Sequence, residues 1–179
     1  VHAAQNNHLN MVKDLVEEHK AKVKAENNNG NTFLMWAAIN NHPKLAKCLI
    51  EKCKANIEEK DNGGSTALIC AARNGHLGVV KCLVEKKANI EEKDDDGKKG
   101  REWGYTAFIS ASLNGHFWIV KYLVEKRKAN VKAKDLKITL QAKEGGVAVF
   151  LISKINYLDE NIIKEVQFVL EDKLNDQLR

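Results

Sequence analysis

A histidine preceded by Asn or Gly recurs along this chain at intervals of 34, 34 and 40 residues. An Ala-Ala or Ala-Ser pair lies shortly before each histidine, and an apolar stripe at helical spacing follows it. An Ala-Asn-Ile or Ala-Asn-Val segment then follows the last three of these stripes. A period in this range indicates units that bury their apolar faces only against their neighbours, so the sequence predicts a repeat solenoid. The histidines are His8, His42, His76 and His116.

Each unit has the pattern of two short helices. In the third unit, Thr66 is a predicted N-cap, because its hydroxyl can accept an early amide hydrogen. Asn74-Gly75 is predicted to end the first helix, since Gly tolerates a positive φ, and Asn41 is the next best residue for that role. The second helix is predicted over 77–85, with Val79, Val80 and Leu83 buried. Pro43 falls in the first turn of the matching helix, where its missing amide hydrogen costs little.

These residues resemble the ankyrin repeat. The third unit matches the family signature at Asp61, Gly64, Thr66, Ala67, Leu68, Ala71, Ala72, Gly75, His76, Val79, Val80 and Leu83. The resemblance implies an all-α solenoid of helix-turn-helix units joined by β-hairpin loops. The chain departs from the family where the usual Gly after the second helix is replaced by Lys87, and where an extra residue gives Cys53-Lys54.

The predicted repeats occupy residues 1–135. A partial first unit spans 1–29 and full units span 30–62, 63–96 and 104–135, with a seven-residue insertion enlarging the loop at about 95–104. Residues 136–179 are expected to form a degenerate fifth repeat and a C-terminal capping helix, because a solenoid needs its apolar end covered. Val1 lies where the middle of a helix is expected, so we expect the chain to be a piece of a longer protein.

The net charge of +5 is concentrated between residues 119 and 144, which hold eight bases and three acids. The basic stretch 121–143 could attract an acidic partner or nucleic acid, or could simply be a solvated edge. No nucleic-acid motif accompanies it, so nucleic acid is not the expected partner. Four cysteines without zinc spacing indicate reduced thiols in an intracellular, cytoplasmic protein. No apolar run is long enough to span a membrane.

By the resemblance, partner proteins contact the loop tips and inner helices on the concave face. The partner-facing residues predicted here are Trp36, Ile39, Asn40, Arg73, Asn74, Trp103, Tyr105, Leu113 and Asn114. Trp36 could anchor a partner or pack between repeats, and both readings remain open. Trp103 is expected to contact the partner, with packing of the loop on itself as the alternative. For Trp118, a second contact and a cover for the insertion are equally open.

No catalytic, metal or cofactor site is predicted. The four histidines recur once per unit without a nearby ligand set, so they are expected to serve the repeat structure. Gly97-Lys98-Lys99-Gly100 lacks the strand–loop–helix context of a phosphate-binding loop. The predicted function is therefore a protein-interaction module without a small-molecule substrate. The rivals are the targeting part of a larger enzyme or effector, and a binder of acidic partners through the basic stretch.

Overall fold

The computed structural model describes residues 27–95, 104–127, 147, 150–151 and 164. The chain divides into two compact units, residues 1–107 and 108–179. The described helices of the first unit are α3 (Phe33–Ile39), α4 (Pro43–Glu51), α5 (Ala67–Arg73) and α6 (Leu77–Glu85). Helix α7 (Ala107–Leu113) starts at the last residue of the first unit, and α8 (Phe117–Lys121) and the π-helix η2 (Tyr122–Lys126) follow it.

A threonine directly precedes the first helix of each pair, which is only seven residues long. Thr66 Oγ1 accepts a hydrogen bond from the Ile69 amide at 3.4 Å, which confirms the predicted N-cap. Gly75 then has a φ of +79°, and Asn41 takes the same left-handed conformation with a φ of +58°. Helices α3 and α5 therefore end where the sequence predicted, because the chain reverses direction at these residues.

The second helix of each pair starts directly after the repeated histidine. His42 and His76 are the N-cap residues of α4 and α6, and Pro43 occupies the first turn as predicted. Helix α6 spans Leu77–Glu85, as expected from the sequence. Val79, Val80 and Leu83 have no exposed surface, so the predicted apolar stripe is the buried face of this helix.

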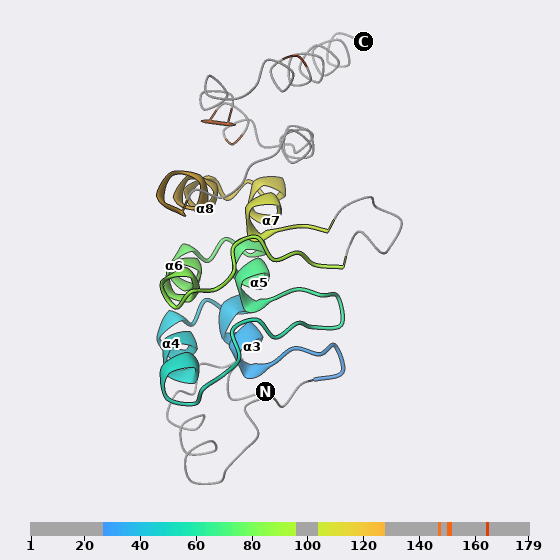
Figure 1. Cartoon of the computed structure of the whole chain (residues 1–179), viewed down its shortest axis with the longest axis vertical. Helices are drawn as coiled ribbons and strands as arrows, with labels where there is room; N and C mark the ends of the chain where they lie inside the picture. Colours follow the sequence, from blue (N-terminus) through green and yellow to red (C-terminus); the bar gives the residue numbers. More distant parts are fainter. Residues whose placement is uncertain (1–26, 96–103, 128–146, 148–149, 152–163, 165–179) are drawn as a thin grey trace. The chain divides into compact units, whose positions relative to one another are not determined.

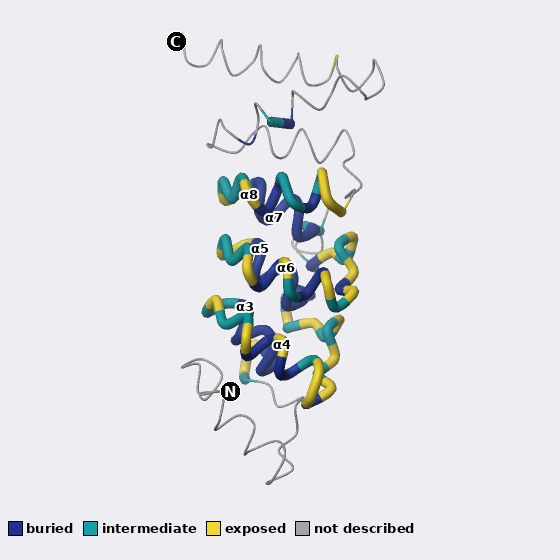
Figure 2. Tube along the Cα trace, turned by 90° about the vertical axis from the view of Figure 1, so that its left-hand side faces the viewer, coloured by how far each residue is buried: buried dark blue, intermediate teal, exposed yellow. Residues whose placement is uncertain are grey.

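The core of the first unit is formed by contacts among its helices. Helix α3 packs against α4 and α5, and α6 packs against α4 and α5 (Figure 1). The repeated alanines, Ala37-Ala38 and Ala71-Ala72, are completely buried. Such small side chains let neighbouring helices approach closely, and the buried residues follow the helices in Figure 2. The all-α repeat architecture is thus confirmed for the described part of this unit.

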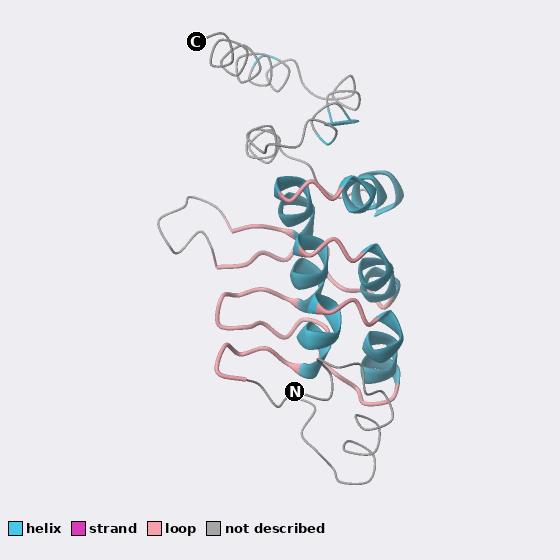
Figure 3. Cartoon of the chain, turned by 180° about the vertical axis from the view of Figure 1, so that it is seen from behind, coloured by secondary structure: helices cyan, strands magenta, loops and turns pink. Residues whose placement is uncertain are grey.

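The loops between helix pairs have the course of hairpins but, within the described residues, no strands (Figure 3). At the turn of one loop, Asp61 Oδ1 accepts hydrogen bonds from the Gly63 and Ser65 amides, both at 2.8 Å. Asn27 Oδ1 does the same for the Asn29 and Asn31 amides. In these tight turns an Asp or Asn side chain accepts the backbone amide hydrogens. Within the described residues no paired strands extend from the turns, so the predicted β-hairpins are not confirmed.

Adjacent loops of the first unit are joined by backbone hydrogen bonds. The Asn62 amide donates to Asn29 O at 3.0 Å, and the Asp95 amide donates to Gly63 O at 2.8 Å. These two bonds occupy equivalent places in successive repeats. Stacking therefore continues from the helices into the loops and holds their turns in register.

The second repeat accommodates its extra residue in the turn after its second helix. There the Ala55 amide donates to Leu49 O, six residues back, at 2.9 Å, whereas in the third repeat the equivalent Ala88 amide donates to Leu83 O, five residues back, at 3.0 Å. In the fourth repeat, α8 continues as the π-helix η2, which is also wider than an α-helix. A single added residue thus changes the helix end without moving the helix start.

Two lysines occupy the left-handed conformation at the place where the family normally has Gly. Lys54 has a φ of +54° and Lys87 a φ of +68°. A side chain with a Cβ atom is strained in this region, whereas Gly is not. The backbone of the family is therefore retained here at an energetic cost.

We expect Lys87→Gly to stabilise the protein by about 0.5–1 kcal/mol, because relief of the left-handed strain exceeds the added entropy of an unfolded Gly. Urea unfolding monitored by circular dichroism would measure the change. Lys81→Gly, inside α6, is the control and is expected to destabilise by about 1 kcal/mol. Equal destabilisation by both substitutions would contradict this explanation.

In the second compact unit, residues 108–179, Phe117 lies edge-on to Phe150, with ring centroids 5.4 Å apart. Val147 and Leu151 are buried. They fall within the predicted fifth repeat, most of which lies outside the described residues. The predicted capping helix also lies outside them, apart from Lys164.

Candidate protein-binding surface

Five of the predicted partner-facing residues lie on the two inner helices of the first unit or directly after them. Trp36 is in the middle of α3, Ile39 and Asn40 are at its C-terminal end, and Arg73 and Asn74 are at the C-terminal end of α5. Helices α3 and α5 pack side by side, so the fold brings these residues from successive repeats to one edge. Together with Tyr105 they are called the inner-helix surface. Its side chains range from half-buried to exposed.

The asparagines of this surface have a structural role that sequence reasoning missed. Asn40 Nδ2 donates to Trp36 O at 2.9 Å, and Asn74 Nδ2 donates to Cys70 O at 2.8 Å. In the second compact unit, Asn114 Nδ2 donates the equivalent hydrogen bond to Ser110 O at 2.8 Å. Each amide therefore caps the helix that precedes it. The signal was the recurrence of one residue type at the histidine spacing, which indicates a structural function.

Ile39 connects the surface to the next repeat through its backbone. Its carbonyl oxygen lies 2.9 Å from His76 Nε2. Because a carbonyl oxygen can only accept, Nε2 carries the proton in this hydrogen bond. This confirms, for His76, the predicted role of the repeated histidines in repeat structure.

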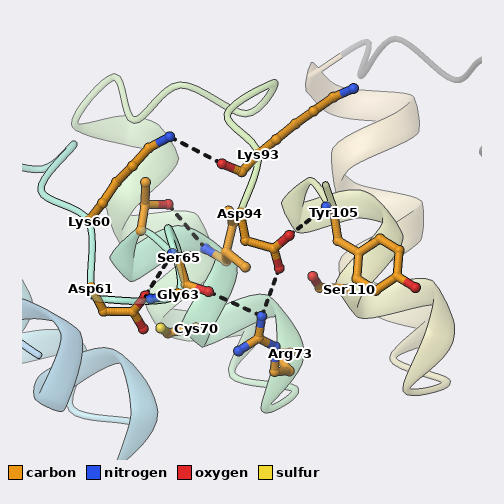
Figure 4. Close-up of polar contacts among 12 residues, drawn as sticks. Lys60, Asp61, Gly63, Ser65, Cys70, Arg73, Lys93, Asp94, Tyr105 and Ser110 are labelled. Carbon is orange, nitrogen blue, oxygen red and sulfur yellow. Dashed lines mark hydrogen bonds and ion pairs between the residues drawn. The ribbon is translucent and has the colours of Figure 1, made fainter. Parts of the chain in front are cut away.

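Arg73 belongs to a polar network at the base of the enlarged loop (Figure 4). Its guanidinium donates to Ser65 Oγ at 3.2 Å and to Asp94 Oδ2 at 3.0 Å. The Arg73 side chain is 42% exposed, whereas that of Asp94 is only 1% exposed. The buried carboxylate thus draws Arg73 toward the loop, although the guanidinium still faces solvent in part.

Asp94 is a residue of this network that the sequence interpretation did not single out. Its Oδ1 accepts a hydrogen bond from the Tyr105 amide at 2.7 Å, and its amide donates to Tyr105 O at 3.1 Å. Asp61 makes the same pair of contacts with Ser65, four residues later. The insertion therefore lies between two residues, Asp94 and Tyr105, that keep the contacts made by Asp61 and Ser65 in the preceding loop. Asp94 follows Asp61 by one repeat length, and this spacing was the available signal.

The base of the enlarged loop is also tightly packed. A Cβ atom added to Gly104 would lie 2.1 Å from the Asp94 carbonyl oxygen. Only Gly fits this close approach of two backbone segments. Asp94, Gly104 and Tyr105 thus fix the two ends of the insertion on the inner-helix surface.

Trp36 is half-buried, and its Nε1 atom is inaccessible to solvent. No hydrogen-bond acceptor for Nε1 is present within the described part of the chain. A buried indole N–H without an acceptor carries a desolvation cost. Both the packing and the contact reading of this residue stay predictions.

The remaining predicted contact residues lie elsewhere. Leu113 and Asn114 are at the end of α7, in the second unit, where Leu113 is half-buried and Asn114 is exposed. Trp103 is outside the described residues. The basic stretch 121–143 is described only as far as Arg127.

Burial controls the chemistry of the cysteines. All four are free thiols. Burial, as the main cause, raises the pKa of the Cys70 thiol to about 12 and also raises that of Cys82. Cys70 is 3% exposed, whereas Cys82 is half-buried. A buried thiol with a raised pKa is a poor nucleophile, because the thiolate is the reactive form.

We therefore expect Cys70 to resist alkylation by iodoacetamide in the folded protein at pH 8. With a pKa of about 12, only about 1 in 10,000 of its thiols is ionised at that pH. Cys82 should react first, and all four cysteines should react in denaturant. Peptide mapping by mass spectrometry would show the order, and modification of native Cys70 before Cys82 would contradict the burial described here.

Other classes of site find no support in the described residues. No group of three or more His, Cys, Asp or Glu side chains in that part of the chain could hold a metal ion. None of its helices is long and apolar enough to cross a bilayer.

Comparison with known proteins identifies the repeats. A family model described as ankyrin repeats in three copies matches residues 1–94, and a single ankyrin-repeat model matches residues 103–133. The two matches leave a gap where the insertion was predicted. No curated protein gives a significant match to the chain.

Proposed function

The chain belongs to the ankyrin-repeat family, whose repeats are generally protein-interaction modules, and from this premise we propose that its inner-helix surface binds a partner protein. The observation that carries the proposal is that Ile39 and Arg73 occupy equivalent positions at the C-terminal ends of the packed helices α3 and α5, and that Asp94 joins Arg73 to Tyr105. A partner lying across this surface would contact several repeats at once. The family is typically non-catalytic, which fits a role as an adaptor or targeting module.

The network around Asp94 supports this location. The buried carboxylate of Asp94 holds the Arg73 side chain and the backbone of Tyr105, so the Arg73 side chain loses little entropy when a partner binds. Aromatic and Arg side chains are also the commonest interface anchors. The fixed ends of the enlarged loop would present its Trp103, which lies outside the described residues, to the same partner.

The test compares two isoleucines of similar burial. Ile39 lies at the end of inner helix α3, and Ile50 lies in outer helix α4; both are half-buried. After a partner is identified by affinity capture, its dissociation constant is measured for Ile39→Ala and for Ile50→Ala. We expect about a fivefold weakening for Ile39→Ala and no change for Ile50→Ala.

Trp36→Ala and Trp103→Ala, each expected to weaken binding by about 1 kcal/mol or more, extend the comparison. Circular dichroism and thermal unfolding serve as fold controls, because Trp36 is half-buried. Unchanged affinity in Ile39→Ala, Trp36→Ala and Trp103→Ala, with the fold intact, would exclude the inner-helix surface.

A further inference from the structure

Charge is separated between two sides of the first unit. The second helices and the turns after them, residues 43–54 and 77–88, hold seven lysines and two glutamates, a net charge of +5. The loop segments 56–61 and 89–95 hold seven acids and two lysines, a net charge of −5. Figure 1 places α4 and α6 on one side of α3 and α5, with the loop tips on the other side. The unit therefore has a basic side and an acidic side.

The acids of the loops are used within the protein. Asp61 and Asp94 accept backbone hydrogen bonds at the turn bases. Glu58 accepts a bond from the Asn89 amide at 2.8 Å, and Glu92 lies 2.6 Å from Lys60 Nζ. This hydrogen-bonded ion pair lowers the pKa of Glu92 and raises that of Lys60. The acidic side is thus a set of contacts within and between repeats.

Most lysines of the outer helices are exposed, although Lys54 Nζ also donates a hydrogen bond to Glu51 O at 3.0 Å. Lys86 pairs with Glu51 across α4 and α6. The other lysines of these two helices, and of the turns that follow them, are exposed. We call these exposed residues, Lys44, Lys47, Lys52, Lys54, Lys81 and Lys87, the lysine surface. No Arg is present in residues 43–54 or 77–88. Lysine ammonium groups act as point charges without the fork geometry that favours specific recognition, so this surface suits a diffuse anionic surface.

In the second compact unit, residues 108–179, the equivalent second helix carries an exposed apolar residue beside a lysine. Trp118 on α8 is 67% exposed, and Lys121 Nζ lies 5.7 Å from the centroid of its ring. Residues 117–127 carry three cations and one acid. Trp beside lysine is the combination that favours the interface of an anionic bilayer, where the ring sits at headgroup depth. The ammonium over the ring face disfavours base stacking, which argues against single-stranded nucleic acid.

We propose that the second helices dock on membranes rich in anionic lipid headgroups: the lysine surface in the first unit and Trp118 with Lys121 in the second. Each unit binds a lipid surface by its own residues. In the first unit this orientation turns the acidic loops away from the membrane. The proposal is independent of the inner-helix surface and of any protein partner.

The test uses the purified protein and vesicles, with sedimentation as the readout. Binding is expected to vesicles of phosphatidylcholine containing about one-quarter phosphatidylserine, to weaken with added salt, and to be absent for phosphatidylcholine alone. Each lysine removed from the surface should weaken binding about fivefold. Lys44→Gln/Lys47→Gln is therefore expected to bind about twenty-fivefold more weakly than the unmodified protein.

The matched control changes the net charge equally on the other side. Asn28→Asp/Asn29→Asp also lowers the charge by two, at exposed loop residues, and should leave vesicle binding within about twofold. Trp118→Ser should weaken vesicle binding and abolish a blue shift of tryptophan emission on binding. Equal losses in the two charge variants, unaltered binding by Trp118→Ser, or tighter binding to duplex DNA than to vesicles would overturn the proposal.

Discussion

Gly64→Ala should destabilise the protein by about 3 kcal/mol, the largest effect expected from a change of one methyl group. Gly64 has a φ of +75°, and a Cβ atom there costs about 1–2 kcal/mol from backbone strain alone. The added atom would also lie 2.7 Å from the Asp95 amide nitrogen of the next loop. The loop must then shift, and the hydrogen bond from Asp95 to Gly63 O weakens.

Gly63→Ala is the matched control for this substitution. The Cβ atom added at Gly63 meets only Asp61 Oδ1 at 3.3 Å, and the residue has no positive φ. We expect a loss of about 0.5 kcal/mol or less. Urea unfolding of both variants gives the comparison. A similar loss for the two variants would mean that the loops do not stack as the structure shows.

Asp94→Ala is expected to destabilise the protein by about 2–3 kcal/mol. The substitution removes the acceptor of the Tyr105 amide hydrogen and the buried partner of Arg73. The loss stays below that of a fully buried ion pair, because the Arg73 side chain is 42% exposed and regains solvent. Binding of a partner at the inner-helix surface should weaken as well, since the ends of the enlarged loop lose their anchor.

Asp94→Asn separates the two contributions. The Asn side chain keeps an oxygen for the Tyr105 amide but loses the charge that holds Arg73. A loss of about 1 kcal/mol, less than half that of Asp94→Ala, is therefore expected from thermal or urea unfolding. Equal losses in the two variants would assign the effect to the charge alone. An unchanged free energy of unfolding in Asp94→Ala would contradict the proposed role of Asp94 in holding Tyr105 and Arg73.

The helices of this protein could be predicted because their limits are set by local chemistry. Thr66 caps α5 through its own hydroxyl, and Gly75 ends the helix through its own φ. The threonine recurs in each full repeat, and Gly or Asn recurs at the helix end, so a single sequence contains several copies of the pattern. Repetition therefore predicted helix ends to the residue in α6.

The contacts within the candidate binding surface were predicted less completely, because residues that are distant in the sequence make them. Asp94 meets Tyr105 across an insertion, and Arg73 meets Asp94 from another helix; no local pattern gives these pairs. Asn40 and Asn74 were assigned to the partner by their position in the family, yet their amides cap helices. Recurrence within the chain would have separated such capping residues from variable ones like Trp36 and Arg73.

Amide hydrogen exchange with and without the bound partner is the most direct test of the proposed binding surface. The account predicts slower exchange in peptides that cover the ends of α3 and α5, residues 36–41 and 70–75. Exchange in α4 and α6 should stay unchanged. Slower exchange confined to the outer helices, with none at residues 36–41 and 70–75, would contradict it.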